Sequence, residues 1–343
     1  MNTPKRVLLI KPSSLGDVIH ALPVLSAIRR TWPQAEVDWV IARGLEQIIS
    51  DTAGINRLVV MDKDKWRRDG IRALPSILRF RNEVRRGKYD LAIDLQGLFR
   101  SALAAYWSGA PVRIGFKKAR EGAPVFYNRR VDYGSAVHAV DRNLKVAEAL
   151  GLETGPVEFN LGVNDDAAER VKALFAECGI SGDYIVVNPG ARWESKLWPA
   201  ERFGAVAKQL AACTGLPVVV TGAASEAAIA KAVCNASGNM AISLAGKTGL
   251  KELVAVLAGA RIVITNDSGP MHIAAAAGTP VVAVFGPTDR NKTGPYGMWH
   301  AVVSAKPECA PCRRRSCDDW RCMTGVSVGD VLAAATEILS RGK

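Results

Sequence analysis

The sequence predicts an α/β protein built from two doubly wound halves. Short runs rich in Val, Ile and Leu alternate with amphipathic segments along the whole chain, which is typical of parallel sheets covered by helices on both faces. The chain has 343 residues, more than one hydrophobic core usually supports. Apolar residues make up 48% of it and charged residues 23%, as in an ordinary folded protein. We therefore expect two Rossmann-like domains.

The first half contains apolar runs that end in turn residues, and helical patterns separate or follow them. Runs of this kind predict buried parallel strands, and apolar residues three or four positions apart predict helices. Strands are expected at residues 6–10, 37–41, 57–62, 91–97 and 112–116, and helices at 17–31, 71–87 and 139–150.

The second half repeats this alternation after a stretch rich in Gly, Pro and acidic residues at 151–166, which is typical of a linker. We expect domains at 1–155 and 156–325 and a terminal helical segment at 326–343. Strands are expected at 184–190, 216–222, 261–267 and 281–287, and helices at 199–214, 225–237, 250–259, 270–277 and 326–340.

The positive charge is concentrated in the first half. The formal net charge is +12, and residues 63–130 hold 17 Lys and Arg against 6 Asp and Glu, a net of 17 − 6 = +11. An anionic partner is expected there. A nucleic-acid-binding protein is the competing class, but few aromatic residues interleave the basic run and no nucleic-acid-binding motif is visible. No apolar run is long enough for a membrane helix or a secretory signal, so we expect a cytoplasmic protein.

The turn KPSSLGD follows the first expected strand and carries Asp17 at the start of a helix. Such a turn often binds phosphate, but a carboxylate would repel one. Asp17 has two interpretations. It could cap the helix, or it could act as a general base directed at a hydroxyl group.

Lys196, in NPGARWESKLWP, follows the strand expected at 184–190. It is either a solvated surface lysine or a catalytic cation that neutralises a leaving group. In ITNDSGPMH, Asp267 or Ser268 could cap the next helix. Alternatively, Ser268, Gly269 and the N–H groups behind them could bind a diphosphate, and Asp267 could accept hydrogen bonds from sugar hydroxyls.

Three further features leave alternatives open. Glu226 either stabilises a helix dipole or binds ribose hydroxyls, and no GxGxxG motif supports a nicotinamide enzyme. His272 and His20 are either structural histidines or site residues. The cluster C-x2-C-x4-C-x4-C is compact enough for a structural zinc, although its polar residues favour a mobile flap; its members are Cys309, Cys312, Cys317 and Cys322.

Several of these stretches together resemble the lipopolysaccharide heptosyltransferases of glycosyltransferase family 9, over nearly the whole chain. They are KPSSLGDVIHALP, DLQGLFRSAL, SKLWPAERF, NDSGPMHIAAAAGTPVVAVFGPTD and PYG. Residues 119–143 are similar to heptosyltransferase I, which adds the first heptose to the Kdo of lipid A. The cysteine cluster is instead similar to members of the second heptosyltransferase type.

The resemblance implies a GT-B fold, in which two Rossmann-like domains face each other across a cleft. The first domain would bind the acceptor and the second the donor, and the last helix would pack back toward the first domain. The implied reaction is an inverting, metal-independent transfer from ADP-L-glycero-D-manno-heptose, with no cofactor. Asp17 would be the base, Lys196 would meet the donor phosphates, and the other donor-binding residues would be Glu226, Asp267, Ser268, Gly269, Pro270 and His272.

The implied acceptor is Kdo-lipid A, whose carboxylates and phosphates suit arginine clusters. We expect the basic surface also to touch the anionic inner leaflet of the inner membrane, and we expect a monomer that binds no nucleic acid. Transfer of the second heptose, use of another nucleotide sugar, or isomerisation of a nucleotide sugar remain alternatives. The acceptor-binding candidates are Ser13, Ser14, Gly16, Lys63, Arg67, Arg68, Arg120, His138 and Arg142.

Overall fold

The computed structural model describes residues 3–341, which divide between Gly162 and Val163 into two compact α/β units. Residues 1–2 and 342–343 of the expected domains lie outside the described residues. The division falls later than the boundary expected after residue 155. The reason is that the intervening stretch still binds the first unit, where Ser26 Oγ donates to the carbonyl oxygen of Glu158 at 2.9 Å.

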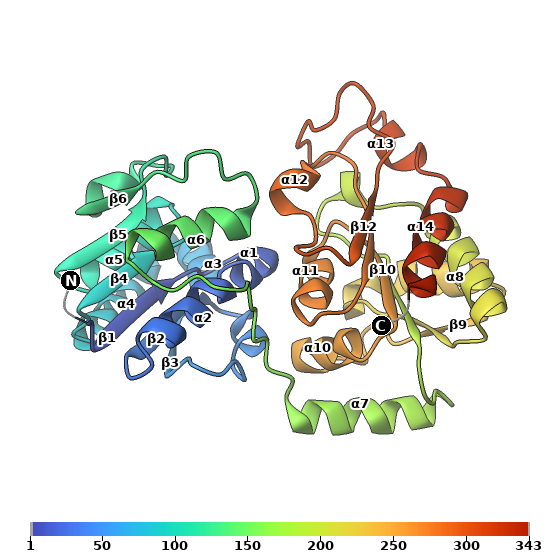
Figure 1. Cartoon of the computed structure of the whole chain (residues 1–343), viewed down its shortest axis with the longest axis horizontal. Coiled ribbons are helices and arrows are strands. Elements are labelled where there is room, and N and C mark those ends of the chain that lie inside the picture. The colour runs from blue at the N-terminus through green and yellow to red at the C-terminus, as the bar shows by residue number, and fades with distance from the viewer. Residues whose placement is uncertain (1–2, 342–343) are drawn as a thin grey trace. The chain divides into compact units, whose positions relative to one another are not determined.

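The first unit contains a six-stranded sheet in the order β3-β2-β1-β4-β5-β6, and all its strand pairs are parallel (Figure 1). Its central strand β1 forms because Val7, Leu8, Leu9 and Ile10 are all fully buried, so that both faces of the sheet are covered. The strands are β1 (Arg6–Ile10), β2 (Glu36–Ala42), β3 (Arg57–Met61), β4 (Leu91–Asp94), β5 (Val112–Phe116) and β6 (Arg129–Val131).

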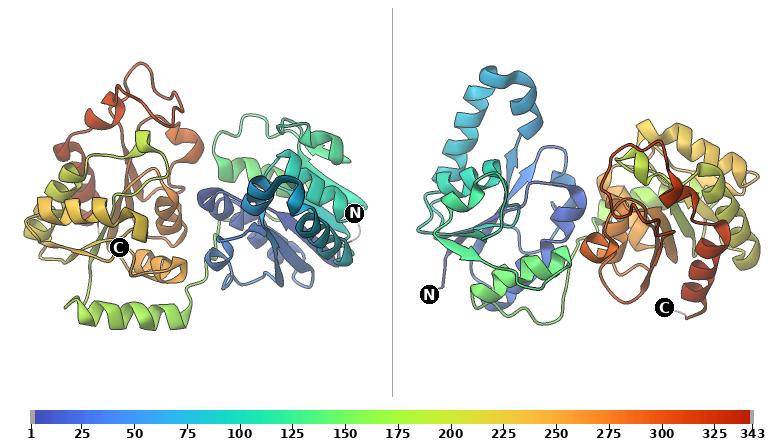
Figure 2. Two further views of the ribbon diagram at one scale, coloured as in Figure 1. Left: turned by 180° about the vertical axis from the view of Figure 1, so that it is seen from behind. Right: turned by 90° about the horizontal axis from the view of Figure 1, so that it is seen from above.

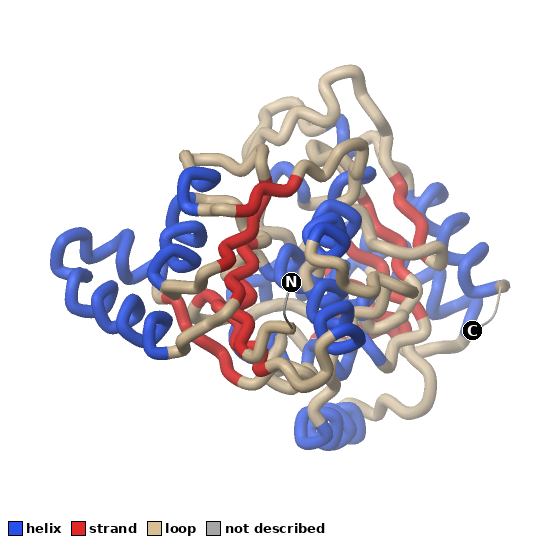
Figure 3. The backbone as a smooth tube through the Cα atoms, turned by 60° about the vertical axis from the view of Figure 1, so that its left-hand side comes forward, coloured by secondary structure: helices blue, strands red, loops and turns tan. Residues whose placement is uncertain are grey.

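Helices flank this sheet (Figure 3). Phe80 and Val84 of α4 and Ala104 and Ala105 of α5 share one buried cluster with β1 and β4, whereas α2 packs against α6. The helices are α1 (Leu15–Ile19), α2 (Leu22–Thr31), α3 (Lys63–Asp69), α4 (Leu74–Arg86), α5 (Phe99–Trp107) and α6 (Ala139–Ala149), with 3-10 turns η1 (Glu46–Ile48), η2 (Gly70–Ala73) and η3 (Ala123–Phe126).

The second unit repeats the architecture, with a parallel sheet in the order β12-β11-β10-β7-β8-β9. Its strands carry the same kind of fully buried aliphatic run, such as Ile262 to Ile264 in β10. They are β7 (Ile185–Asn188), β8 (Val218–Val220), β9 (Ala241–Ser243), β10 (Ile262–Asn266), β11 (Val281–Val284) and β12 (His300–Val303).

The helices α8, α9 and α14 share the main core of this unit with β7, β8, β10 and β11. The helix α14 contacts α8, β10, β11 and β12 of its own unit, and its packing toward the first unit stays a prediction. The helices are α7 (Asp165–Glu177), α8 (Ala200–Thr214), α9 (Ala227–Ala236), α10 (Leu250–Ala258), α11 (Gly269–Ala276), α12 (Arg290–Thr293), α13 (Arg321–Thr324) and α14 (Val328–Ser340), with 3-10 turns η4 (Glu194–Lys196) and η5 (Ala224–Glu226).

Several expected elements differ from the observed ones. The helix expected at 17–31 is divided into α1 and α2, and Pro23, which has no N–H to donate, lies in the first turn of α2. Part of the expected linker at 151–166 begins α7, for which the side chain of Asn164 provides the N-cap. Within residues 3–341, no helix is long and apolar enough to cross a membrane.

Candidate functional site

Each sheet has a switch point, where the connections leave two adjacent strands in opposite directions. It lies between β1 and β4 in the first unit and between β7 and β10 in the second. Ligands of open α/β sheets bind beyond the carboxyl ends of the strands at such points. The loops after these four strands carry Ser13, Gln96, Lys196 and Asp267, so each unit has its own candidate site.

In the first unit, Asp17 is the third residue of α1, and Ser14 is the N-cap. The capping alternative was therefore wrong in placing Asp17 as the cap itself. Asp17 Oδ2 accepts hydrogen bonds from the Ser14 N–H at 3.0 Å and from the Ser14 hydroxyl at 2.7 Å, as in a capping box. Its side chain is nevertheless 40% exposed. The carboxylate is thus held in place and still open to solvent.

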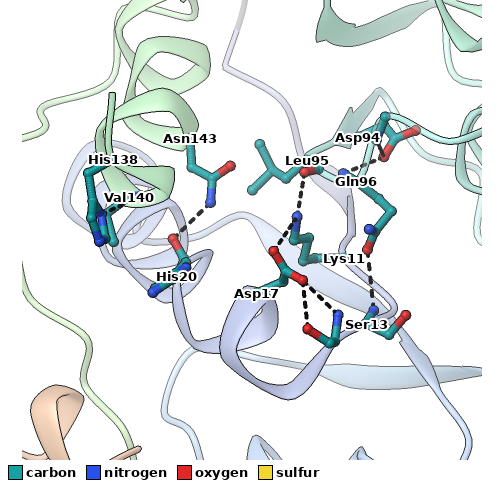
Figure 4. Close-up of polar contacts among 12 residues, drawn as sticks. Lys11, Ser13, Asp17, His20, Asp94, Leu95, Gln96, His138, Val140 and Asn143 are labelled. Carbon is teal, nitrogen blue, oxygen red and sulfur yellow. Dashed lines mark hydrogen bonds and ion pairs between the residues drawn. The ribbon is translucent and has the colours of Figure 1, made fainter. Parts of the chain in front are cut away.

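Lys11, directly after β1, lies beside this carboxylate (Figure 4). Its side chain is only 8% exposed, and Nζ lies 3.8 Å from Asp17 Oδ1. Nζ also donates to the carbonyl oxygen of Leu95 at 2.8 Å, while Gln96 Oε1 accepts from the Ser13 N–H at 3.3 Å. The loops after β1 and β4 are therefore tied together around Asp17.

The side chain of Asp94 fixes the loop after β4 through hydrogen bonds to its backbone. It is fully buried and accepts from the N–H groups of Gln96 at 2.8 Å and Gly97 at 3.2 Å, and from the hydroxyl of Tyr127 at 2.7 Å. Burial raises the pKa of the Asp94 carboxyl, and these donors oppose that effect. Asp94 ends β4 earlier than expected because its side chain binds the N–H groups that the strand would have used.

The basic candidates of the first unit differ in their surroundings. Lys63 Nζ donates to Ser13 Oγ at 2.7 Å, so it belongs to the Asp17 site. Arg67, Arg68 and Arg120 are exposed. The Arg142 guanidinium lies 4.7 Å from the centre of the Tyr133 ring.

His138 has a structural role that the sequence did not indicate. It is the N-cap of α6, and its Nδ1 accepts from the Val140 N–H at 3.1 Å. Its ring centre lies 5.1 Å from that of buried His20. In the same layer, Asn143 donates to the carbonyl oxygen of His20 at 2.9 Å, which ties α6 to the end of α1.

In the second unit, Lys196 is not a solvated surface lysine. Its side chain is 16% exposed, and Nζ lies 2.6 Å from Oδ2 of Asp267, whose side chain is 4% exposed. Thr288 donates to the same oxygen, and Nζ lies 4.7 Å from the centre of the Trp193 ring. The loops after β7, β10 and β11 therefore meet at one ion pair.

The helix α11 begins beside this pair. Ser268 is its N-cap residue, Gly269 is its first residue and Pro270 lies in its first turn, but the Ser268 side chain forms no capping hydrogen bond. Its Oγ instead lies 3.4 Å from Thr265 Oγ1. His272, one turn further on, is buried. A helix start of this kind presents backbone N–H groups to an anion.

Glu226 lies after β8, close to the turn that follows β7. Its Oε2 accepts from the Ala223 N–H at 2.8 Å. A Cβ atom added at Gly190 would lie 2.1 Å from Glu226 Oε1, so only glycine permits this close approach. The Glu226 carboxylate is thereby placed at the same sheet edge as the Lys196 loop.

The four-cysteine segment follows β12. Cys309 and Cys312 are exposed, Cys317 is half-buried and Cys322 is buried. The pKa of the Cys322 thiol is raised by burial and, to a smaller extent, by the other three thiols. Among the residues that the structure describes, no group of three or more His, Cys, Asp or Glu side chains could hold a metal ion.

Comparison with known proteins identifies the family. The family described as glycosyltransferase family 9 (heptosyltransferase) matches residues 77–320. Lipopolysaccharide heptosyltransferase 1 of Pseudomonas aeruginosa is 33% identical over 91% of this chain and 87% of its own length. The Escherichia coli K12 protein of the same name is 32% identical over 88% and 94%, and lipopolysaccharide heptosyltransferase 3 of that strain is 29% identical over 80% of each chain. The chain belongs to glycosyltransferase family 9.

Solved structures of the family confirm the fold class. A family 9 glycosyl transferase from Veillonella parvula superposes with a TM-score of 0.85, at 27% identity over 100% of this chain and 99% of that one. E. coli heptosyltransferase WaaC with ADP gives 0.79 at 28% identity over 97% and 99%. The same protein with ADP-2-deoxy-2-fluoro heptose gives 0.76 at 28% over 98% and 100%. This chain is thus a glycosyltransferase of α/β, GT-B type.

Sequence reasoning missed several residues of the two sites, among them Lys11, Asp94, Gln96 and Thr288. Lys11 is the first residue of the KPSSLGD turn, but nothing in the sequence pattern singles out its side chain. Gln96 and Thr288 lie in the stretches DLQG and GPTD, each directly after a strand. The signal that could have found them is the one that found Asp267, a polar residue just after a buried strand.

Proposed function

We propose that this glycosyltransferase transfers L-glycero-D-manno-heptose from ADP-heptose to the Kdo sugar of a lipid A precursor, with inversion and without a metal ion. The reaction would take place in the cytoplasm, at the inner leaflet of the inner membrane. The names of the relatives and the ligands of the E. coli structures support the donor and the acceptor class. The observation that carries the proposal is the half-exposed Asp17 carboxylate held at a switch point.

Asp17 would act as the general base. Its carboxylate would take the proton of the acceptor hydroxyl, whose oxygen would then attack the anomeric carbon of the heptose. The bond from that carbon to the diphosphate oxygen would break on the opposite side, and ADP would leave. The anomeric configuration inverts because a single displacement takes place. This requires the switch points of the two units to face the same substrate, which is part of the proposal.

The second unit would bind the donor. The Lys196 ammonium and the N–H groups at the start of α11 would stabilise the charge that develops on the departing ADP. Asp267 would keep Lys196 in place through the 2.6 Å ion pair. Glu226 would accept hydrogen bonds from the ribose hydroxyls. The Lys196 ammonium and the α11 N–H groups would supply the positive charge that a divalent ion would otherwise provide, so turnover in excess EDTA should equal turnover without it.

Asp17→Asn tests the base directly. Turnover should fall by about 10²- to 10⁴-fold, the usual contribution of a positioned general base. The affinity for ADP-heptose, measured by calorimetry, should stay unchanged because the donor would bind the other unit. Asp132→Asn, which changes an exposed aspartate of the same unit, is the matched control. Near-normal turnover of Asp17→Asn would exclude Asp17 as the base.

The acceptor is tested by a matrix of donors and acceptors with mass detection. Kdo-lipid A, a lipid A precursor that already carries one heptose, and no acceptor would each be combined with several nucleotide sugars. We expect product only from ADP-heptose with Kdo-lipid A. Product only from the heptosylated acceptor would instead assign the second transfer. Conversion of the nucleotide sugar without any acceptor would indicate an isomerase.

A further inference from the structure

The segment α3-η2-α4 forms an arm that projects from the sheet of the first unit (Figure 2, right). We define the basic arm as residues 63–88. It contains ten Lys and Arg and three Asp and Glu, a net of 10 − 3 = +7. Two of its three acidic residues are paired with arginines, Asp69 with Arg68 at 2.9 Å and Glu83 with Arg57 at 3.8 Å. The arm is therefore a concentrated positive surface.

The tip of the basic arm is apolar as well as charged. Ile71 is 88% exposed, Leu74 50% and Leu78 41%. They are spaced three and four residues apart, so they lie on one side of the helical segment. The opposite side of α4 is already used, because Phe80 and Val84 are buried in the core cluster of the first unit. The exposed side is consequently not needed for packing within this unit.

The exposed side of α4 changes from apolar to mainly basic along the helix. The apolar residues lie at its N-terminal end, and the exposed residues toward its C-terminal end are Arg79, Asn82, Arg85 and Arg86, of which three are basic. A surface that combines inserted aliphatic side chains with flanking arginines matches the interface of an anionic bilayer. The phosphates of a nucleic acid would attract the arginines, but they would form no apolar contact with Ile71 or Leu74.

We propose that the basic arm docks this enzyme on the surface of an anionic lipid bilayer. Ile71, Leu74 and Leu78 insert among the acyl chains, and the arginines of α4 meet the phosphate headgroups. At the root of the arm, Lys63 donates to Ser13 Oγ at 2.7 Å, so the docking element continues into the Asp17 site. This proposal rests on the proposed function, and it assigns the membrane contact to the basic arm. Its test measures lipid binding rather than sugar transfer, so either can fail alone.

The apolar tip is tested with the triple variant Ile71→Ser, Leu74→Ser and Leu78→Ser. Binding of the full-length protein to phosphatidylglycerol-containing vesicles, measured by co-sedimentation, should weaken by more than about tenfold. The matched control removes three exposed apolar side chains of the second unit, through Val163→Ser, Met240→Ser and Met298→Ser, and should bind like the unchanged protein. An unchanged thermal midpoint verifies folding of both variants.

The charge is tested with Arg79→Gln, Arg85→Gln and Arg86→Gln. Each charge near an anionic membrane contributes about fivefold in affinity, so the triple variant should bind about a hundredfold more weakly. Added salt should have a similar effect, and vesicles of phosphatidylcholine alone should bind weakly. Equal binding to neutral and anionic vesicles would overturn the proposal. So would full vesicle binding by the apolar-tip variant, or tighter binding to a DNA duplex than to the vesicles.

Discussion

Replacing Tyr127 by phenylalanine removes one hydroxyl from the buried carboxyl of Asp94 and leaves the ring in place. That hydroxyl donates to Asp94 Oδ2 at 2.7 Å, and Asp94 is fully buried, so no solvent replaces the lost donor. A hydrogen bond to a charged group contributes about 1.5–3 kcal/mol. We therefore expect the free energy of unfolding of the first unit to fall by about 2 kcal/mol at a pH where the Asp94 carboxyl is ionised.

The loss should depend on pH, and the direction follows from Asp94. Burial raises the pKa of its carboxyl above the ordinary value of 3.8, so the folded unit binds this proton more tightly than the unfolded chain. The stability contributed by Asp94 is therefore highest at low pH and decreases as the pH rises toward the raised pKa. The Tyr127 hydroxyl favours the carboxylate, so its removal raises that pKa further. The variant should consequently lose more stability at high pH than at low pH.

Hydrogen exchange of peptides from residues 91–116 would report the stability of this unit at pH values below and above the raised pKa of Asp94. Tyr89→Phe is the matched control, because it removes a hydroxyl that donates at 2.6 Å to another buried carboxylate, Asp38. Asp38 keeps Arg57 at 2.9 Å, so the Tyr89→Phe variant should lose less stability than Tyr127→Phe. A Tyr127→Phe loss that stays constant or shrinks as the pH rises would refute this reasoning.

Two predictions concern the donor site. Lys196→Met should lower turnover by about 10²- to 10³-fold, as the loss of one electrostatic donor does. The control Lys247→Met changes an exposed lysine and should leave turnover unchanged. Equal rates of the two variants in a steady-state assay would contradict the role of Lys196. Gly190→Ala should displace the Glu226 side chain and weaken ADP-heptose binding, measured by calorimetry, by about ten- to a hundredfold. The control Gly329→Ala should leave the affinity unchanged, because a Cβ atom there meets only the Ser327 hydroxyl at 3.7 Å. Full affinity of Gly190→Ala would show that Glu226 does not bind the donor.

The strands that could be predicted are those with a run of aliphatic residues in the sequence, although not every residue of β3 or β5 is buried. The bounds of β1 match the prediction because four successive aliphatic residues are fully buried, and no polar residue interrupts them. The edge strands β6, β9 and β12 were missed. They have only three or four residues, and all four residues of β12 are half-buried. An edge strand needs fewer apolar side chains, so it leaves a weaker pattern in the sequence.

The sequence predicted individual residues of the two sites, but it did not predict which of them contact one another. Asp17, Lys196 and Asp267 follow strands, and that position alone singled them out. The contact from Lys11 Nζ to the Leu95 carbonyl oxygen joins residues 84 positions apart. It exists only because β1 pairs with β4 rather than with β3, which no local pattern specifies. The pairing of Lys196 with Asp267 has the same origin, since β7 lies beside β10.

Each switch point has an ion pair between a lysine and an aspartate, but the more exposed partner differs between the two units. In the first unit the lysine is the covered partner, with Lys11 8% and Asp17 40% exposed. In the second unit the carboxylate is the covered partner, with Asp267 4% and Lys196 16% exposed. Each pair is neutral overall, which limits the cost of placing charge at the end of a buried sheet. The group left reachable is an acceptor of protons in one unit and a cation in the other. In the proposed mechanism, one fold used twice would thus present a base to a hydroxyl and a positive charge to a departing diphosphate.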